Sequence, residues 1–182
     1  MKAPVAVFAI GNRSRGDDAA APALLDRLQA WLASEGPRQD FELFEAYQLQ
    51  PEDALDLAGR RVALFIDASR AVNAGVAFRE EAPRAGLAAT HALAPAALLD
   101  LYGKLGLGPP PPAFVMEIGA SRFELGEGLS REAEAALERA WPLLCGLASA
   151  ARPEAWRALA GGEGSQVPAD RVAPVAAPRS PR

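Results

Sequence analysis

The chain has 182 residues, of which 50% are hydrophobic, so it is long enough for one domain with a substantial core and too short for two. Its formal net charge of -4 provides no basic field for a phosphate backbone, and we expect no nucleic-acid partner. The single cysteine, Cys145, excludes an internal disulfide and a cysteine-rich zinc site. No apolar stretch approaches the roughly 20 residues that span a bilayer, so we expect a cytoplasmic protein without membrane association.

The first half of the chain alternates between predicted strands and helices. Residues 5–10 form a continuous β-prone run, and apolar residues recur at helical spacing over residues 19–34. A second strand is predicted at residues 41–47, at a distance that suits a right-handed crossover between parallel strands. A short helix at residues 51–57 precedes the most apolar strand, residues 62–66, which we expect to end at Asp67.

The second half continues this alternation and then changes in composition. Residues 76–79 predict a short edge strand that is a candidate for antiparallel pairing, and residues 95–105 predict a helix. A strand at residues 113–118 is followed by a long amphipathic helix that Ser130 caps. Beyond Arg152 the chain is rich in Pro, Ala and Gly. We therefore predict an α/β domain over residues 1–151 and a flexible tail over residues 152–182.

The loop after the first strand has the glycine spacing of a phosphate-binding loop but the wrong charge. Gly11 and Gly16 match G-x-x-x-x-G, whereas Asp17 and Asp18 stand where such a loop places Lys and then Ser or Thr. Two carboxylates would repel a polyphosphate. Nucleotide binding by an α/β domain therefore remains only as a less favoured alternative.

The two consecutive acids at the end of this loop predict two different roles. An acid before a helix satisfies unpaired backbone N–H groups at the first turn. Neighbouring helical residues point about 100° apart, so one acid can cap the helix while the other faces the crevice. We assign the capping role to Asp17 and the crevice to Asp18.

Three residues of metal-binding type are expected at one edge of the sheet. Asp18 and Asp67 follow strands, and His91, the only histidine, precedes a helix at the same edge. Two carboxylates and an imidazole suit a divalent transition ion such as nickel, zinc or manganese. The sequence contains no H-E-x-x-H signature, so we expect weak or transient binding. Glu117 ends another strand, where it either lines the crevice or caps the strand.

Several motifs, in order along the chain, resemble those of the hydrogenase maturation endopeptidases, which process the large subunit of nickel-iron hydrogenases. The resemblance covers residues 5–147 and includes the glycine loop with Gly11 and Asn12 as accessory residues. The motifs are Ala9-Ile10-Gly11-Asn12 through Gly16-Asp17-Asp18, Gln48-Leu49-Gln50-Pro51-Glu52, Phe65-Ile66-Asp67-Ala68, Thr90-His91-Ala92-Leu93-Ala94-Pro95, Glu117-Ile118-Gly119, and the stretch from Phe123 to Ser130.

This resemblance implies a three-layer α/β/α sandwich around a twisted, mostly parallel sheet of about five strands. It also implies that Asp18, Asp67 and His91 contact nickel. In the family the nickel belongs to the substrate, a large-subunit precursor whose short C-terminal extension the protease removes. We therefore expect a monomeric, aspartic-type endopeptidase whose partner is that precursor.

The catalytic hypothesis is that Asp67 or Asp18 orients or deprotonates a water molecule near the scissile bond. A non-enzymatic alternative keeps the same fold and the same metal ligands. It is a precursor-binding or nickel-escort protein that does not cleave.

Overall fold

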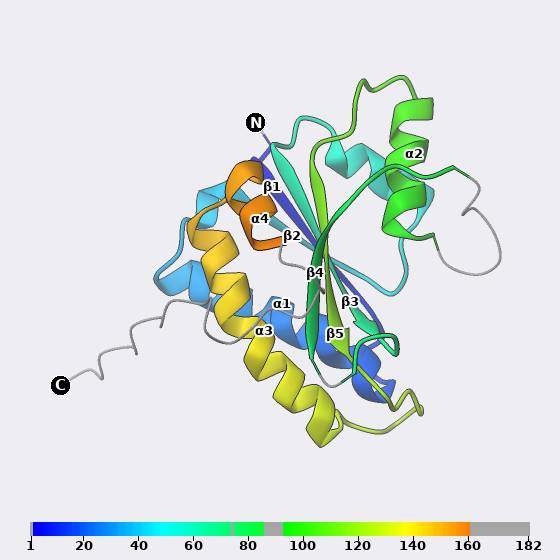
Figure 1. Ribbon diagram of the computed structural model, residues 1–182, viewed down its shortest axis with the longest axis vertical. Coiled ribbons are helices and arrows are strands. Elements are labelled where there is room, and N and C mark those ends of the chain that lie inside the picture. Colours follow the sequence, from blue (N-terminus) through cyan, green and yellow to red (C-terminus); the bar gives the residue numbers. More distant parts are fainter. Residues whose placement is uncertain (1, 74, 86–92, 161–182) are drawn as a thin grey trace.

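The computed structural model describes residues 2–73, 75–85 and 93–160. Its centre is a five-stranded sheet with the strand order β2-β1-β3-β5-β4 (Figure 1). Four strands are parallel, and the edge strand β4 runs antiparallel to β5. The predicted α/β class and mostly parallel sheet are thus confirmed. The strands are β1 (Val5–Ile10), β2 (Phe41–Ala46), β3 (Val62–Ser69), β4 (Val76–Glu81) and β5 (Ala113–Gly119).

Helices cover both faces of the sheet, which confirms the three-layer arrangement. One face carries α1 (Ala20–Ser34), α3 (Arg131–Ser149) and α4 (Pro153–Ala160), and the other carries α2 (Pro95–Lys104) and the 3-10 helix η3 (Pro51–Leu57) (Figure 1). Two shorter 3-10 helices, η1 (Gly16–Ala19) and η2 (Arg38–Asp40), precede α1 and β2. No helix within the described ranges is long and apolar enough to cross a membrane.

The central strands are hydrophobic without interruption because both of their faces are buried. Successive side chains of a strand point to opposite faces. Val7 and Ala9 of β1 therefore belong to the core beneath α1 and α3, whereas Phe8 and Ile10 belong to the core beneath α2 and η3. The same alternation places Asp67, which follows Phe65 by two positions, on the α2 face of β3.

Strand β3 is longer than its apolar run. The sequence predicts that it ends at Asp67, but it continues to Ser69 because the neighbouring strand β5 extends alongside. Ala68 and Ser69 pair with Ile118 and Gly119 of that strand. Asp67 is consequently held within a strand ladder rather than in a loop.

The compact part of the chain also extends beyond the expected boundary at residue 151. Helix α4 packs on the sheet through Trp156, which is 1% exposed. Its indole N–H donates to the carbonyl of Leu147 at 2.9 Å, and its ring meets Phe114 edge-on at 5.3 Å. The domain therefore reaches Ala160. Residues 161–182 lie outside the described residues, and the rest of the tail stays a prediction.

Candidate functional site

Three acidic residues gather where the carboxyl ends of β1, β3 and β5 lie side by side. Asp18 follows β1 after the glycine loop, and Asp67 and Glu117 are direct register partners on β3 and β5. Ligand sites of open α/β sheets form at this edge. The structure thus brings together three of the residues that the sequence singles out.

Asp67 is the residue whose ionisation this environment changes most. Burial raises the pKa of Asp67 to about 7, opposed by the N–H of Ala68 at 2.8 Å and assisted by the negative charges of Asp18 and Glu117. A carboxyl group with this pKa exchanges its proton near neutral pH, as a general acid or base must. The charges of Asp18 and Glu117 thus both favour the protonated form of Asp67.

The loop that carries Asp18 is held close to β1. Burial raises the pKa of Asp18, and the backbone N–H of Asn12, 3.1 Å from the carboxylate Oδ2, and the charge of Arg15 oppose this shift. Gly11 has a φ of +151°, and a Cβ there would lie 2.0 Å from the carbonyl oxygen of Asp18. Any side chain at position 11 would therefore push Asp18 away from the strand end.

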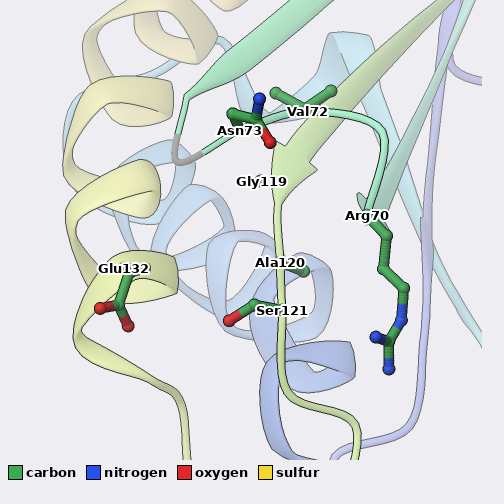
Figure 2. A pocket seen from close by; sticks show the side chains of 7 residues that line it. All are labelled: Arg70, Val72, Asn73, Gly119, Ala120, Ser121 and Glu132. Atoms are coloured by element: carbon green, nitrogen blue, oxygen red, sulfur yellow. The ribbon is translucent and has the colours of Figure 1, made fainter.

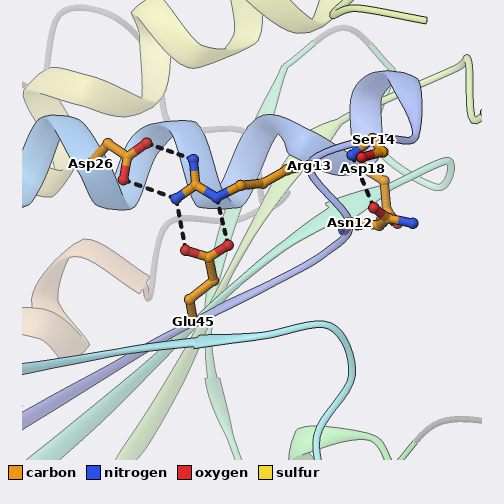
Figure 3. A network of polar contacts seen from close by, with 6 residues as sticks. All are labelled: Asn12, Arg13, Ser14, Asp18, Asp26 and Glu45. Carbon is orange, nitrogen blue, oxygen red and sulfur yellow. Dashed lines mark hydrogen bonds and ion pairs between the residues drawn. The ribbon is translucent and has the colours of Figure 1, made fainter. Parts of the chain in front are cut away.

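Ion pairs of Arg13, which were not predicted from the sequence, also hold this loop to α1 and β2. The Arg13 guanidinium donates to both carboxylate oxygens of Asp26 on α1, at 2.7 and 2.9 Å. It also donates to both oxygens of Glu45 on β2, at 2.6 and 2.7 Å (Figure 3). Such bidentate pairs define orientation as well as contact. No local motif reveals them, because both partners lie in other elements.

The structure corrects the role assigned to Asp17. This residue is 0% exposed, and the N-cap residues of η1 and α1, Arg15 and Ala19, make no side-chain capping bond. Its carboxylate instead accepts hydrogen bonds from the backbone N–H groups of Ser121 and Arg122, at 2.8 and 2.9 Å. It also accepts bonds from the N–H and hydroxyl of Ser130, at 2.7 and 3.0 Å.

The ionised form of Asp17 is favoured despite its burial. Burial alone would raise the pKa of Asp17, but the N–H groups of Arg122, Ser121 and Ser130 and the Ser130 hydroxyl outweigh it and lower the pKa. The same hydroxyl accepts the Ala133 N–H at 3.1 Å, so Ser130 caps α3 as predicted. Asp17 therefore supports a helix far along the chain rather than the one that it precedes.

A cleft of about 700 Å³ opens beside Asp67 and Glu117 on the α2 face. Leu93 and Ala94 form one wall together with the first residues of α2, and Arg79 and Glu81 of β4 contribute charge on another. The Arg79 Nε lies 3.6 Å from Glu117 Oε2, and its guanidinium also pairs with Glu81. Arg79 was not singled out from the sequence. Ala77 pairs with Glu117, and residues two positions apart on a strand share a face, so Arg79 lies on the α2 face as well.

The third expected metal ligand, His91, lies outside the described residues. Among the residues that are described, no group of three or more His, Cys, Asp or Glu side chains is arranged to hold a metal ion. Nickel binding by Asp18, Asp67 and His91 therefore stays a prediction.

No protein-family model and no curated protein sequence matches the chain, but solved structures do. The hydrogenase-maturating endopeptidase HybD from E. coli superposes with a TM-score of 0.60 at 18% identity, over 79% of this chain and 90% of that one. The [NiFe] hydrogenase maturation protease HycI from Thermococcus kodakarensis has a TM-score of 0.57 at 23% identity, over 79% and 90% of the two chains. The chain has the fold of the hydrogenase maturation endopeptidases.

A third solved structure, the hydrogenase 2 maturation peptidase from a Thaumarchaeota archaeon, has a TM-score of 0.54 at 20% identity. The match covers 77% of this chain and 94% of that one. Each solved chain is thus matched over nearly its whole length. The comparison establishes the fold, and the chemistry has to come from the residues themselves.

Replacing Asp17 and Asp18 one at a time should show which of them stabilises the fold. Asp17→Asn replaces one of the two accepting oxygens by an NH₂ group, which cannot accept the hydrogen bonds made there, and we expect it to lower the free energy of unfolding by about 2–4 kcal/mol. Asp18→Asn should change it by less than about 1 kcal/mol, because Asp18 accepts a single backbone bond. Urea unfolding followed by circular dichroism measures both, and equal effects would contradict the assignment.

The raised pKa of Asp67 predicts how stability depends on pH in metal-free buffer. The folded protein holds the Asp67 proton up to about pH 7, whereas the unfolded chain loses it near pH 3.9. The folded state binds more protons between these values, so its stability falls as the pH rises through this window. Asp67→Asn should remove this part of the fall and be more stable than the wild type at pH 8, by about 1–3 kcal/mol.

Asp56→Asn is the matched control for this measurement. Asp56 makes an ion pair with Lys2 at 3.7 Å, and its side chain is 37% exposed. This variant should keep the wild-type decline between pH 4 and pH 7. If the decline survives unchanged in Asp67→Asn, Asp67 is not its source.

Proposed function

We propose that the chain is an endopeptidase that removes the C-terminal extension of a nickel-loaded [NiFe] hydrogenase large-subunit precursor. The observation that carries this proposal is the position of Asp67, with a pKa of about 7, where it lines a cleft together with Glu117 and is influenced by the charge of Asp18. The fold supports it, since solved structures of the same fold bear the names of hydrogenase maturation proteases. The motifs from the glycine loop onward support the same substrate.

Peptide hydrolysis needs an activated water and a proton for the leaving amine. Asp67 is favoured over Asp18 for this work because its pKa lies near neutral pH. As a carboxylate it takes a proton from water while the water oxygen adds to the scissile carbonyl carbon. When the C–N bond breaks, Asp67 returns that proton to the amine nitrogen. One group thus serves as base and then as acid.

The nickel in this proposal is cargo of the precursor. Asp18 and Asp67 offer carboxylate oxygens, which with an imidazole suit an incompletely coordinated divalent ion. A cation between the carboxylates would offset their mutual repulsion, and the precursor would complete the coordination shell. Metal loading would then act as a checkpoint, because an empty precursor lacks the ion that both carboxylates favour.

The test compares nickel-loaded with nickel-free precursor. Each form is incubated with the purified full-length chain, and C-terminal truncation is read from the intact mass of the precursor. We expect truncation of the loaded form only. Binding of the loaded form without truncation would instead identify an escort protein, and nucleotide affinity with neither would identify a nucleotide-binding domain.

A further inference from the structure

The segment of residues 120–130, between β5 and α3, lacks regular secondary structure but is firmly attached to the rest of the fold. It lies beside the beginning of α1 (Figure 1). Four bonds to the glycine loop hold it, in addition to those of the Asp17 carboxylate. They are Asp17 N–H to Arg122 O at 2.8 Å, Gly16 N–H to Glu127 O at 3.1 Å, Gly126 N–H to Ser14 O at 2.8 Å and Arg15 Nε–H to Phe123 O at 2.9 Å.

This fixed segment presents an apolar side chain to solvent. Leu125 is 77% exposed, and Tyr47, which follows β2 at the same edge of the sheet, is 65% exposed. A single exposed leucine on a protein surface is ordinary. Leu125, however, belongs to a segment that the buried Asp17 carboxylate holds in place. Its side chain is therefore already positioned for a partner. Such a surface binds with little loss of conformational entropy.

A cation lies over Phe123, two residues before this leucine. The Arg70 guanidinium lies over the ring of Phe123, 4.5 Å from its centroid. Stacking on an aromatic ring orients the planar guanidinium and leaves its N–H edge available for a carboxylate. In the part of the chain that the structure describes, no carboxylate pairs with Arg70, which is exposed.

A cavity of about 350 Å³ adjoins Arg70 (Figure 2). The backbone of Gly119 and Ala120 runs between Arg70 on one side and Ser121 and Glu132 on the other, and small residues there leave space for another chain. Arg70 and Glu132 carry opposite charges, so a peptide that carries charges of both signs can pair with each of them here.

We propose that Arg70, Phe123 and Leu125, with the adjoining cavity, form the docking surface for the folded large-subunit precursor. This inference rests on the proposed function. The occupant follows from continuity with the candidate site. Arg70 comes directly after the end of β3, the strand that carries Asp67, and the segment is bonded to the loop that leads to Asp18. The precursor would place an apolar side chain against Leu125 and a carboxylate against Arg70.

Steady-state processing of nickel-loaded precursor by Leu125→Ser and by Arg70→Ala tests this surface. We expect KM to rise about tenfold in each variant, while kcat stays within about twofold, because docking contributes equally to the bound state and the transition state. The exposed positions should leave the melting temperature unchanged. Leu55→Ser is the matched control, since Leu55 is 53% exposed on η3, and its KM should equal that of the wild type.

The outcomes separate this inference from the proposed function. If the wild type cleaves and both variants keep the wild-type KM, the docking surface is wrong and the proposed function stands. If the wild type binds the precursor without cleaving it, the proposed function is wrong. In that case the dissociation constant of the precursor is compared between the wild type, Leu125→Ser and Arg70→Ala. A tenfold rise in both variants supports the docking surface, and no rise overturns it. A wild type that neither binds nor cleaves overturns both.

Discussion

The buried carboxylate of Asp17 is the interaction on which the site depends. Its four hydrogen bonds join η1, which follows the glycine loop, to the 120–130 segment and to the N-cap residue of α3. Because Ser130 both donates to Asp17 and caps α3, the position of that helix is tied to the glycine loop. The loop in turn sets where Asp18 lies relative to Asp67. One buried, fully bonded charge thus fixes the edge where the chemistry would occur.

Asp17 and Asp18 illustrate how the environment divides two identical side chains. Asp17 is the more buried, yet its pKa is lowered because donors surround its oxygens. Asp18 is only half-buried, yet its pKa is raised because one N–H and the charge of Arg15 do not offset its desolvation. A carboxylate whose oxygens already accept several hydrogen bonds from the protein is poorly placed to bind a ligand. A carboxylate with few such bonds is stabilised by binding a cation or a proton. This contrast favours Asp18 and Asp67 as the reactive pair.

The sequence predicted the fold and the shared edge because both follow from local patterns. Uninterrupted apolar runs marked the buried strands, and Asp67 stood out as a charge after such a run. The partners of Asp17 lie more than a hundred residues away, and no periodicity encodes them. Helix α4 was missed because it is short and its composition resembles that of the tail. Its Trp156 acquires a role only through contact with Phe114.

The central claim of the proposed function is that Asp67 activates the water and that Asp18 and Asp67 together contact the nickel of the precursor. The direct measurement is the processing rate of nickel-loaded precursor by Asp18→Asn and Asp67→Asn, with Asp56→Asn as the control and circular dichroism confirming the fold of each. The account predicts rates at least about 100-fold below the wild type for both variants and a wild-type rate for the control. Rates within twofold of the wild type in Asp18→Asn and Asp67→Asn would contradict it.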